Sequence, residues 1–498
     1  DLNASRYTPS STLQRMELLK TGYMGTLSLG WDNYLFLELT GRQERSSTLK
    51  DQSFFYPSAN LSFLFTQAFH MPSWWNYGKL RLSYGIVGNA PETYTANIVY
   101  EQGSDNGFTW NTIPSSWGNA DIRPEKKYEY EIGLESKFLN NRLGIDVSYY
   151  NNRVKDQILS TPQPSTSGVK NVLMNVGEVA NHGWDISISA TPILTRDFRW
   201  DLTANYGVYK NKVVKLADGV PYLEILNSGG SGIKIQAVEG QPMGDIYAQV
   251  PQVNENGEYL VSDKGLYLNQ TELQKVGNIN PAGVGGLFNS FSYKNVFLDF
   301  SIDFRIGGDV INEMNQYATA VGLTPESLKY RDTEHGGLSY YYPGDNNSSG
   351  IPVQVDPSTG VGPNGEIIYH DGIILPGVVA STGERNTRII PAGYYYNTTY
   401  NWGTEAEQLT YRHSVFDNSY VKLRELTIGY QFPEKMISKL GLGRLSVSVF
   451  GRNLFYFYKA LKNYDAESSV GTSWANQATV GSSTTATRSF GVSLRASF

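Results

Sequence analysis

Several residue types and patterns are missing from this chain of 498 residues. It contains no cysteine, which fits an oxidising envelope where a stray thiol is a liability. No stretch approaches 18 consecutive apolar residues, and this absence excludes membrane-spanning helices. Basic residues are not in surplus, because the net charge is -6, which argues against nucleic acid as a partner.

Catalytic and metal-binding signatures are also missing. The five histidines stand at neither metal-ligand nor catalytic-triad spacing: His70, His182, His335, His370 and His413. Two acidic turns, 254–257 and 345–347, lack the bidentate glutamate of a calcium loop. No glycine-rich phosphate loop follows a strand and opens a helix. We therefore expect no enzyme, no catalytic residue, no metal site and no cofactor.

Aromatic residues and alternating segments are abundant instead. The chain holds 35 Tyr, 21 Phe and 9 Trp, and its mean hydropathy is -0.35. Between Lys127 and Phe138, tyrosines and aliphatic residues alternate with lysines and glutamates. Such a charged face does not suit a globular core, but it suits a water-filled lumen. The last segment, Phe490–Phe498, alternates up to its final residue, as expected of a closing strand that leaves no open edge in lipid.

The whole chain shows this pattern, and we predict an all-β transmembrane antiparallel β-barrel. Thirteen strands are expected, at 21–31, 34–46, 54–67, 78–87, 127–138, 142–153, 182–191, 198–210, 283–293, 296–306, 418–431, 443–455 and 486–498. The parity slips at Arg424-Glu425, which predicts a β-bulge. Short connections alternate with long ones (87–126, 154–181, 211–282, 307–417 and 456–485), the layout of short periplasmic turns and long extracellular loops.

Single-chain bacterial barrels have even strand numbers, so thirteen strands point to a piece. We expect residues 1–498 to form the last thirteen of about 22 strands, with the plug domain, the N-terminal strands and a signal peptide outside this sequence.

Smaller features complete the expectation. Charges on the polar strand faces (Glu129, Glu131, Asp146, Asp201, Asp299, Asp303, Arg305 and Arg495) either pair with a plug or keep the lumen wet. Trp74, Trp75, Trp184 and Trp200 lie at strand ends, where an interfacial girdle is the default role. Residues 309–319 read as a short helix with Asp309 as its cap, and 433–439 as a helical turn that begins with a proline.

Several segments resemble the SusC/RagA family of TonB-dependent outer-membrane transporters. They are Trp75–Asn89, Glu239–Tyr247, Ser419–Tyr430 and Gly451–Leu454, with the closing Phe498. The resemblance implies a 22-strand barrel filled by a plug, a surface lipoprotein lid of the SusD type, energy from the TonB complex, and a dimer of barrel–lid pairs in the outer membrane. It also implies oligosaccharide or oligopeptide cargo. Nothing in the chain matches the plug or a TonB-binding box.

Aromatic residues in the expected outer loops are the candidates for cargo binding: Trp110, Trp117, Tyr341, Tyr395, Trp402 and Trp474. Flat rings stack on sugar faces, and their edges pack against peptide side chains. The alternative is that they fix loop structure or contact a lipoprotein lid.

We interpret the chain as the C-terminal barrel of a SusC-like nutrient importer. Two other functions stay open. A plugless passive channel would need no energy coupling, and a surface receptor or adhesin would use 307–417 to hold a partner without uptake.

Overall fold

The computed structural model describes residues 15–50, 53–105, 108–228, 232–344, 350–401, 410–468, 471, 473–481 and 486–497. The chain divides into two compact units, which are described separately. The first unit comprises residues 1–185, 210–223 and 238–240. The second comprises 186–209, 224–237 and 241–498. Where the helices are described, none is long and apolar enough to cross a membrane.

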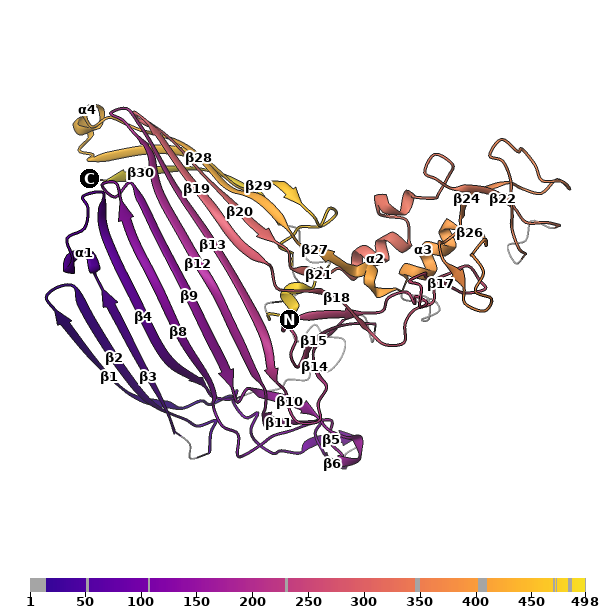
Figure 1. Ribbon diagram of the computed structural model, residues 1–498, viewed down its shortest axis with the longest axis horizontal. Helices are drawn as coiled ribbons and strands as arrows, with labels where there is room; N and C mark the ends of the chain where they lie inside the picture. Colours follow the sequence, from indigo (N-terminus) through magenta and orange to yellow (C-terminus); the bar gives the residue numbers. More distant parts are fainter. Residues whose placement is uncertain are drawn as a thin grey trace, which may run out of the picture. The chain divides into compact units, whose positions relative to one another are not determined.

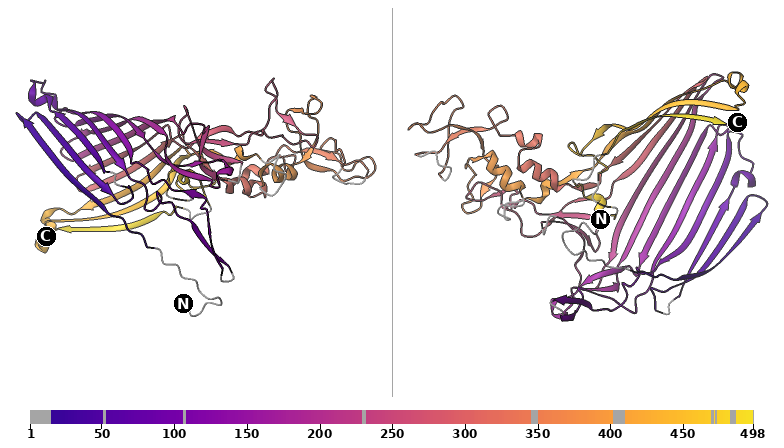
Figure 2. Two further views of the ribbon diagram at one scale, coloured as in Figure 1. Left: turned by 90° about the horizontal axis from the view of Figure 1, so that it is seen from below. Right: turned by 180° about the vertical axis from the view of Figure 1, so that it is seen from behind.

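Thirteen long strands form one sheet, in which each strand is hydrogen-bonded to the next long strand of the chain (Figure 1). They are β1 Lys20–Trp31, β2 Leu35–Ser46, β3 Ser53–Phe63, β4 Trp75–Asn89, β8 Glu125–Phe138, β9 Leu143–Lys155, β12 Glu178–Leu194, β13 Phe198–Lys215, β19 Gly283–Tyr293, β20 Val296–Ile306, β28 Tyr420–Gln431, β29 Arg444–Lys459 and β30 Ser489–Ser497. All thirteen predicted strands are thus confirmed, and the views from below and behind show the same succession (Figure 2). Phe498 lies outside the described residues.

The predicted bulge is confirmed at Arg424. Ser301 pairs with Glu425 and Ile302 with Leu423, so Arg424 is the extra residue of β28. The same irregularity recurs against β29. Because a bulge restores the alternation on either side of it, the apolar residues of β28 stay on one face.

Alternation gives each strand an apolar and a polar face, as β8 shows. Tyr130, Ile132 and Leu134 are 46%, 47% and 43% exposed. On the opposite face, Lys127 contacts Glu129 at 2.5 Å. Exposed apolar side chains on one face of a sheet and ion pairs on the other are the arrangement of a strand between lipid and a wet lumen.

Tight turns join the strands at one end of the sheet. Asp32 and Asn33 have φ of 48° and 60°, the positive values that the two central residues of a type I′ turn need, and the Tyr34 amide donates to the Trp31 carbonyl to close that turn. Two of these turns carry short helices, α1 Phe65–Ala68 between β3 and β4, and α4 Glu434–Ile437 with η5 Ser438–Leu440 between β28 and β29. Pro433 is the N-cap of α4, so the helical turn predicted at 433–439 is confirmed.

At the other end of the first unit, the long connections carry small sheets. The elements are β5 Glu101–Asp105 with β6 Phe108–Thr112, and β7 Ser116–Trp117 with β10 Ile158–Pro162 and β11 Asn171–Asn175, and also η2 Ser165–Ser167. A buried cluster lies there, comprising Leu49, Phe54, Ala90, Ala96 and Ile122.

The long connections of the second unit carry most of its remaining elements. The strands are β14 Tyr222–Ser228 (which begins in the first unit), β15 Ile233–Val238, β16 Asp245–Ala248, β17 Leu260–Val261, β18 Gln274–Asn278, β21 Asp309–Ile311, β22 Leu338–Tyr341, β23 Val353–Gln354, β24 Tyr369–Ile373, β25 Val378–Val379, β26 Ile390–Pro391 and β27 Val415–Asp417. The helices are α2 Glu313–Ala320, η3 Pro325–Leu328, α3 Ala392–Tyr400, η4 Tyr411–Ser414 and η6 Asn476–Ala478.

The helix expected at 309–319 begins later than predicted. Residues 309–311 form β21, which pairs with β27. The cap of α2 is Asn312, whose side chain accepts a hydrogen bond from the Asn315 amide. Asp309 is not the cap, because its carboxylate accepts a hydrogen bond from the Asn278 amide at 2.9 Å.

Three long connections, which join β13 to β19, β20 to β28 and β29 to β30, pack together. We call their described residues in 224–237, 241–282, 307–419 and 460–481 the outer loop body. One buried cluster draws on all three connections: Ile233, Ile235, Ile246, Ala248, Ile279, Ile311, Val415, Ala475 and Ala478. A second cluster contains Leu266, Ile373, Leu375 and Ile390. The outer loop body therefore has a hydrophobic core of its own.

Candidate functional site

The polar faces of the strands are the first part of the candidate site. In the first unit, the Arg81 guanidinium donates two hydrogen bonds to Asp146, at 3.1 and 2.6 Å, and one to the Ser148 hydroxyl at 3.2 Å. Glu135 lies 3.6 Å from the same guanidinium. A bidentate arginine–carboxylate pair holds both groups in one geometry, so these charges form a fixed pattern on the polar face.

A glycine makes room for this arginine. A Cβ atom at Gly133 would lie 2.8 and 2.9 Å from two nitrogen atoms of Arg81 and 3.0 Å from the Ser148 hydroxyl. The guanidinium can therefore lie flat across β8 only because position 133 has no side chain.

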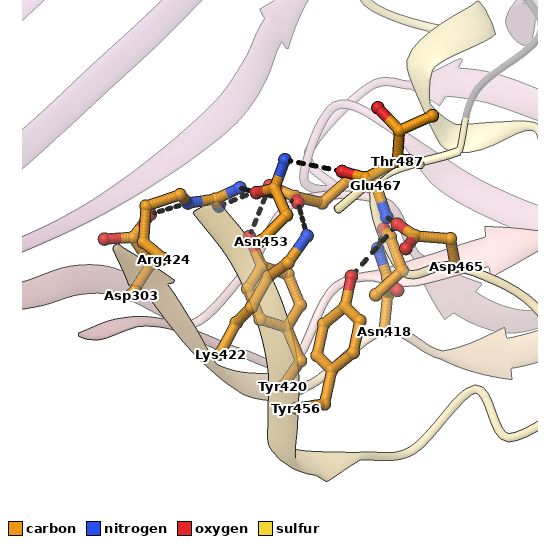
Figure 3. A network of polar contacts seen from close by, with 11 residues as sticks. Asp303, Asn418, Tyr420, Lys422, Arg424, Asn453, Tyr456, Asp465, Glu467 and Thr487 are labelled. Carbon is orange, nitrogen blue, oxygen red and sulfur yellow. Dashed lines mark hydrogen bonds and ion pairs between the residues drawn. The ribbon is translucent and has the colours of Figure 1, made fainter. Parts of the chain in front are cut away.

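In the second unit, one loop glutamate joins the polar face of the strands to a long connection (Figure 3). Arg424 donates to the two Glu467 carboxylate oxygens at 2.9 and 2.6 Å. Lys422 lies 2.5 Å from the same carboxylate. Arg424 also bonds Asp303 on β20 at 2.6 Å and Asn453 on β29 at 2.9 Å. The segment 460–468 is thereby fastened to β28, and Arg424 in turn is held by β20 and β29.

Lys422 is the least accessible charge of this network. It is 1% exposed, and its ammonium lies 4.8 Å from the centre of the Tyr456 ring. Burial alone would raise the pKa of Glu467, but the hydrogen bonds from Arg424 and Lys422 prevail and lower it to about 2. Glu467 is therefore ionised at neutral pH and compensates a buried lysine.

Further hydrogen bonds hold the same segment. Tyr456 donates its hydroxyl to Asp465 at 3.0 Å, and the Asn418 side chain donates to the Ala466 carbonyl at 2.9 Å (Figure 3). Since these bonds reach both a side chain and a backbone carbonyl of the segment, the loop is fixed in position as well as neutralised in charge.

Comparison with known proteins accords with this architecture. A family model described as TonB dependent receptor-like, β-barrel, matches residues 3–246. TonB-dependent receptor P3 of Formosa agariphila is 24% identical over 494 residues, which cover 90% of this chain and 42% of that protein. TonB-dependent receptor SusC of Bacteroides thetaiotaomicron is 30% identical over 247 residues, 46% of this chain and 24% of that protein. A structure of the RagAB peptide transporter covers 93% of this chain and 47% of its own, with a TM-score of 0.65 and 19% identity.

Over residues 3–246 the chain matches the TonB-dependent receptor-like β-barrels. The resemblance to SusC and RagA found in its motifs is confirmed, and the protein resides in the outer membrane. The chain spans less than half the length of the relatives it matches.

Most charges predicted on the barrel wall have partners within the chain. Besides Asp146 and Asp303, Asp299 accepts from Ser290 at 2.6 Å and Asp201 accepts from Arg199 at 2.5 Å. The Arg305 guanidinium donates to the Ile279 and Gly307 carbonyls at 3.0 and 3.2 Å. Pairing with a plug domain stays a prediction for all of them.

The structure places the described members of the predicted cargo-binding set in three long connections. In the first unit, Trp110 lies on β6, is 46% exposed and covers Gly103, while Trp117 is half-buried edge-on to Tyr100. In the second unit, Tyr341 is half-buried on β22 and Trp474 is 37% exposed beside Gly244. No ring contact joins any two of the predicted residues within the described part of the chain.

The other two predicted residues are Tyr395, which is packed in the outer loop body, and Trp402. Tyr395 lies on α3 and packs against the cluster around Leu266, and burial raises the pKa of its hydroxyl. Its ring lies 5.1 Å from that of Tyr396, so it has a packing role in the outer loop body. Trp402 lies outside the described residues. Cargo contact stays a prediction for the whole set.

Sequence reasoning missed the Glu467 network. The signal for its strand half is visible, because Lys422 falls on the polar face just before the bulge and Arg424 is the bulged residue itself. Glu467 itself gives no signal, since it lies in an irregular connection 43 residues after Arg424.

Proposed function

We propose that this chain forms the outer loops and part of the barrel wall of a SusC-like importer. The importer would take up oligosaccharides or oligopeptides with a SusD-like lipoprotein lid and energy from the TonB complex. A plug domain and further strands would come from sequence outside residues 1–498. No bond in the cargo would be made or broken by this chain.

The observation that carries this proposal is the shared core of the outer loop body. Connections that are far apart in sequence bury Ile235, Ile311 and Ala478 in one cluster. A surface with its own core keeps its shape without a ligand, so a lid can seat on it without the entropy cost of ordering loose loops. A passive channel has no need of such a platform.

The network around Glu467 supports the same function. It fastens the last long connection to the polar face through Arg424 and Lys422. Cargo that enters from outside would therefore meet a fixed polar surface. The exposed rings of Trp110 and Trp474 supply flat apolar faces, which suit both sugar rings and peptide side chains.

Uptake assays in the native bacterium test the proposal. Labelled oligosaccharides and oligopeptides would be offered to the parent strain, to a strain without TonB and to a strain without the SusD-like lipoprotein. We expect accumulation of one cargo class in the parent strain, and its loss in both mutants.

Each alternative function predicts a different outcome. Uptake that survives the loss of TonB would indicate a passive channel. Cargo that binds to cells but never enters them, with or without the lid, would indicate a receptor or adhesin. The denatured mass of the native protein serves as a check, since attached plug and strands require a species well above 55.4 kDa.

A further inference from the structure

The apolar face of the first unit ends in a cluster of basic residues at the long-loop end. Tyr84, Tyr130 and Ile132 are 48%, 46% and 47% exposed on this face. Their cross-strand register is continuous, since Tyr84 pairs with Tyr130 and Ile132 with Tyr149. In an outer-membrane barrel, this exposed apolar face contacts lipid.

Aromatic residues mark the two borders of the lipid-facing band. At the short-turn end, Trp74 stacks on Trp75 and Phe138 with ring centres 5.9 Å apart in each case. Tyr128 lies ten residues before Phe138 on the same face of β8. At 3.4 Å per residue and a tilt of 35–45°, ten residues span about 24–28 Å across the membrane, the height of the apolar band. Tyr128 therefore lies at the head-group level.

Three cations lie at or beyond this border on the same face. Lys126 stands directly opposite Lys155, and Arg153 directly opposite Tyr128. Glu178 contacts Arg153 at 3.0 Å and Lys155 at 4.0 Å, and Lys126 has no ion-pair partner within the described residues. Like charges directly opposite each other across two strands are destabilising. One carboxylate for three cations leaves two positive charges uncompensated.

Two of these cations, Arg153 and Lys155, border a pocket of about 220 Å³. Its other lining residues are Tyr84, Tyr128, Glu129, Tyr130 and Asn151, and Lys126 lies beside it, directly opposite Lys155. The Lys155 ammonium lies 5.9 Å from the centre of the Tyr128 ring. The pocket thus combines aromatic rings toward the apolar band with cationic groups toward the head groups.

We propose that this pocket binds the phosphorylated head group of an outer-leaflet glycolipid. Lys126, Arg153 and Lys155 hold the phosphate, and the acyl chains lie along the rings of Tyr84 and Tyr130. The outer leaflet is indicated because the pocket lies at the end of the long loops, which are extracellular in outer-membrane barrels. A membrane lipid fits better than a soluble anion, because the pocket opens on the lipid-facing side of the strands.

Lipid binding by the full-length protein tests this assignment. The protein would be purified in a neutral detergent, stripped of lipid and titrated with bisphosphorylated lipid A, with dephosphorylated lipid A and with inorganic phosphate. The test variant is K126Q/R153Q/K155Q. The control variant K294Q/K435Q/K439Q removes the same charge from exposed positions at the short-turn end.

We expect the test variant to bind bisphosphorylated lipid A about 100-fold more weakly, at about fivefold for each basic residue. The control variant should match the wild type, and dephosphorylated lipid A should bind the wild type as weakly as the test variant binds lipid A. Equal binding of both lipid forms, or an equal loss in the control, would overturn the proposal. Inorganic phosphate binding as tightly as lipid A would also overturn it.

A single substitution tests the proposal even if the triple variant misfolds. Lys126 is exposed, so K126Q should leave the strand pairing intact. Its affinity for bisphosphorylated lipid A should fall about fivefold, and unchanged affinity would remove Lys126 from the site.

Discussion

Replacing Glu467 by alanine should release the segment 460–468 from the barrel strands. The substitution removes the hydrogen bonds from Arg424 and leaves the Lys422 ammonium buried without a carboxylate. Breaking a buried ion pair by removing one partner costs about 3–5 kcal/mol. Because the Glu467 side chain is 31% exposed, we expect about 2–3 kcal/mol, which raises the population of the detached segment roughly 30- to 160-fold.

Hydrogen–deuterium exchange of peptides covering 460–468 measures this opening. Exchange should accelerate in E467A and stay at the wild-type rate in E334A, which removes an exposed loop glutamate. Adding K422M to E467A removes the buried lysine charge that has lost its partner, and it should restore part of the protection against exchange. The reasoning fails if E467A exchanges at the wild-type rate, or if K422M brings no recovery.

The same anchor should respond to acid in a defined window. The pKa of Glu467 is lowered in the folded protein to about 2, from an ordinary value of 4.5. A lowered pKa means that the stabilisation is complete above pH 4.5 and is lost as the pH falls toward 2. In a His413→Phe background, which removes the titration of the buried histidine, protection of 460–468 should therefore be constant from pH 5 to 8, and a decline within that range would contradict the assignment.

Three other predictions follow from the structure. Gly133→Ala should displace the Arg81 guanidinium and destabilise the first unit by about 1–2 kcal/mol, seen as a lower melting temperature, whereas Gly25→Ala, with no atom within 4 Å of the new Cβ, should stay near the wild type. Asn312→Ala removes the N-cap of α2 and should cost about 1 kcal/mol, seen as faster hydrogen exchange in that helix; unchanged exchange would refute the capping role. Burial, with help from a neighbouring arginine, lowers the pKa of His413 to about 4, so the outer loop body should lose stability as the pH falls from 6.5 to 4, and His413→Phe should abolish that dependence.

The strands could be predicted from the sequence because each contacts lipid on one side and water on the other. That environment imposes the alternation of apolar and polar residues seen at Lys127–Phe138, and it makes the interruption of this alternation at the bulge of Arg424 visible. The strand ends were less visible. β12 begins at Glu178 and ends at Leu194, beyond the predicted 182–191, because strand pairing continues where alternation no longer separates apolar from polar residues.

The loops could not be predicted in the same way, since their structure depends on distant partners. Asp309 resembles a helix cap locally, but residues 309–311 pair with 415–417, more than 100 residues later. The role of Glu467 likewise depends on its ion pairs with Lys422 and Arg424, which lie more than 40 residues earlier in the chain. The aromatic candidates could be chosen from the sequence by residue type, but only the structure shows that Trp110 and Trp474 are exposed whereas Tyr395 is packed.

The contrast between the strands and the outer loop body has a consequence for the order of folding. Each long strand pairs with the next long strand, so most pairings close after modest chain excursions. The core of the outer loop body brings Ile233 against residues as distant as Val415 and Ala478, and it cannot form until all three connections have been delivered. We infer that the outer loop body matures last, and that a defect in its core delays protease resistance of the loops while the strands assemble on time.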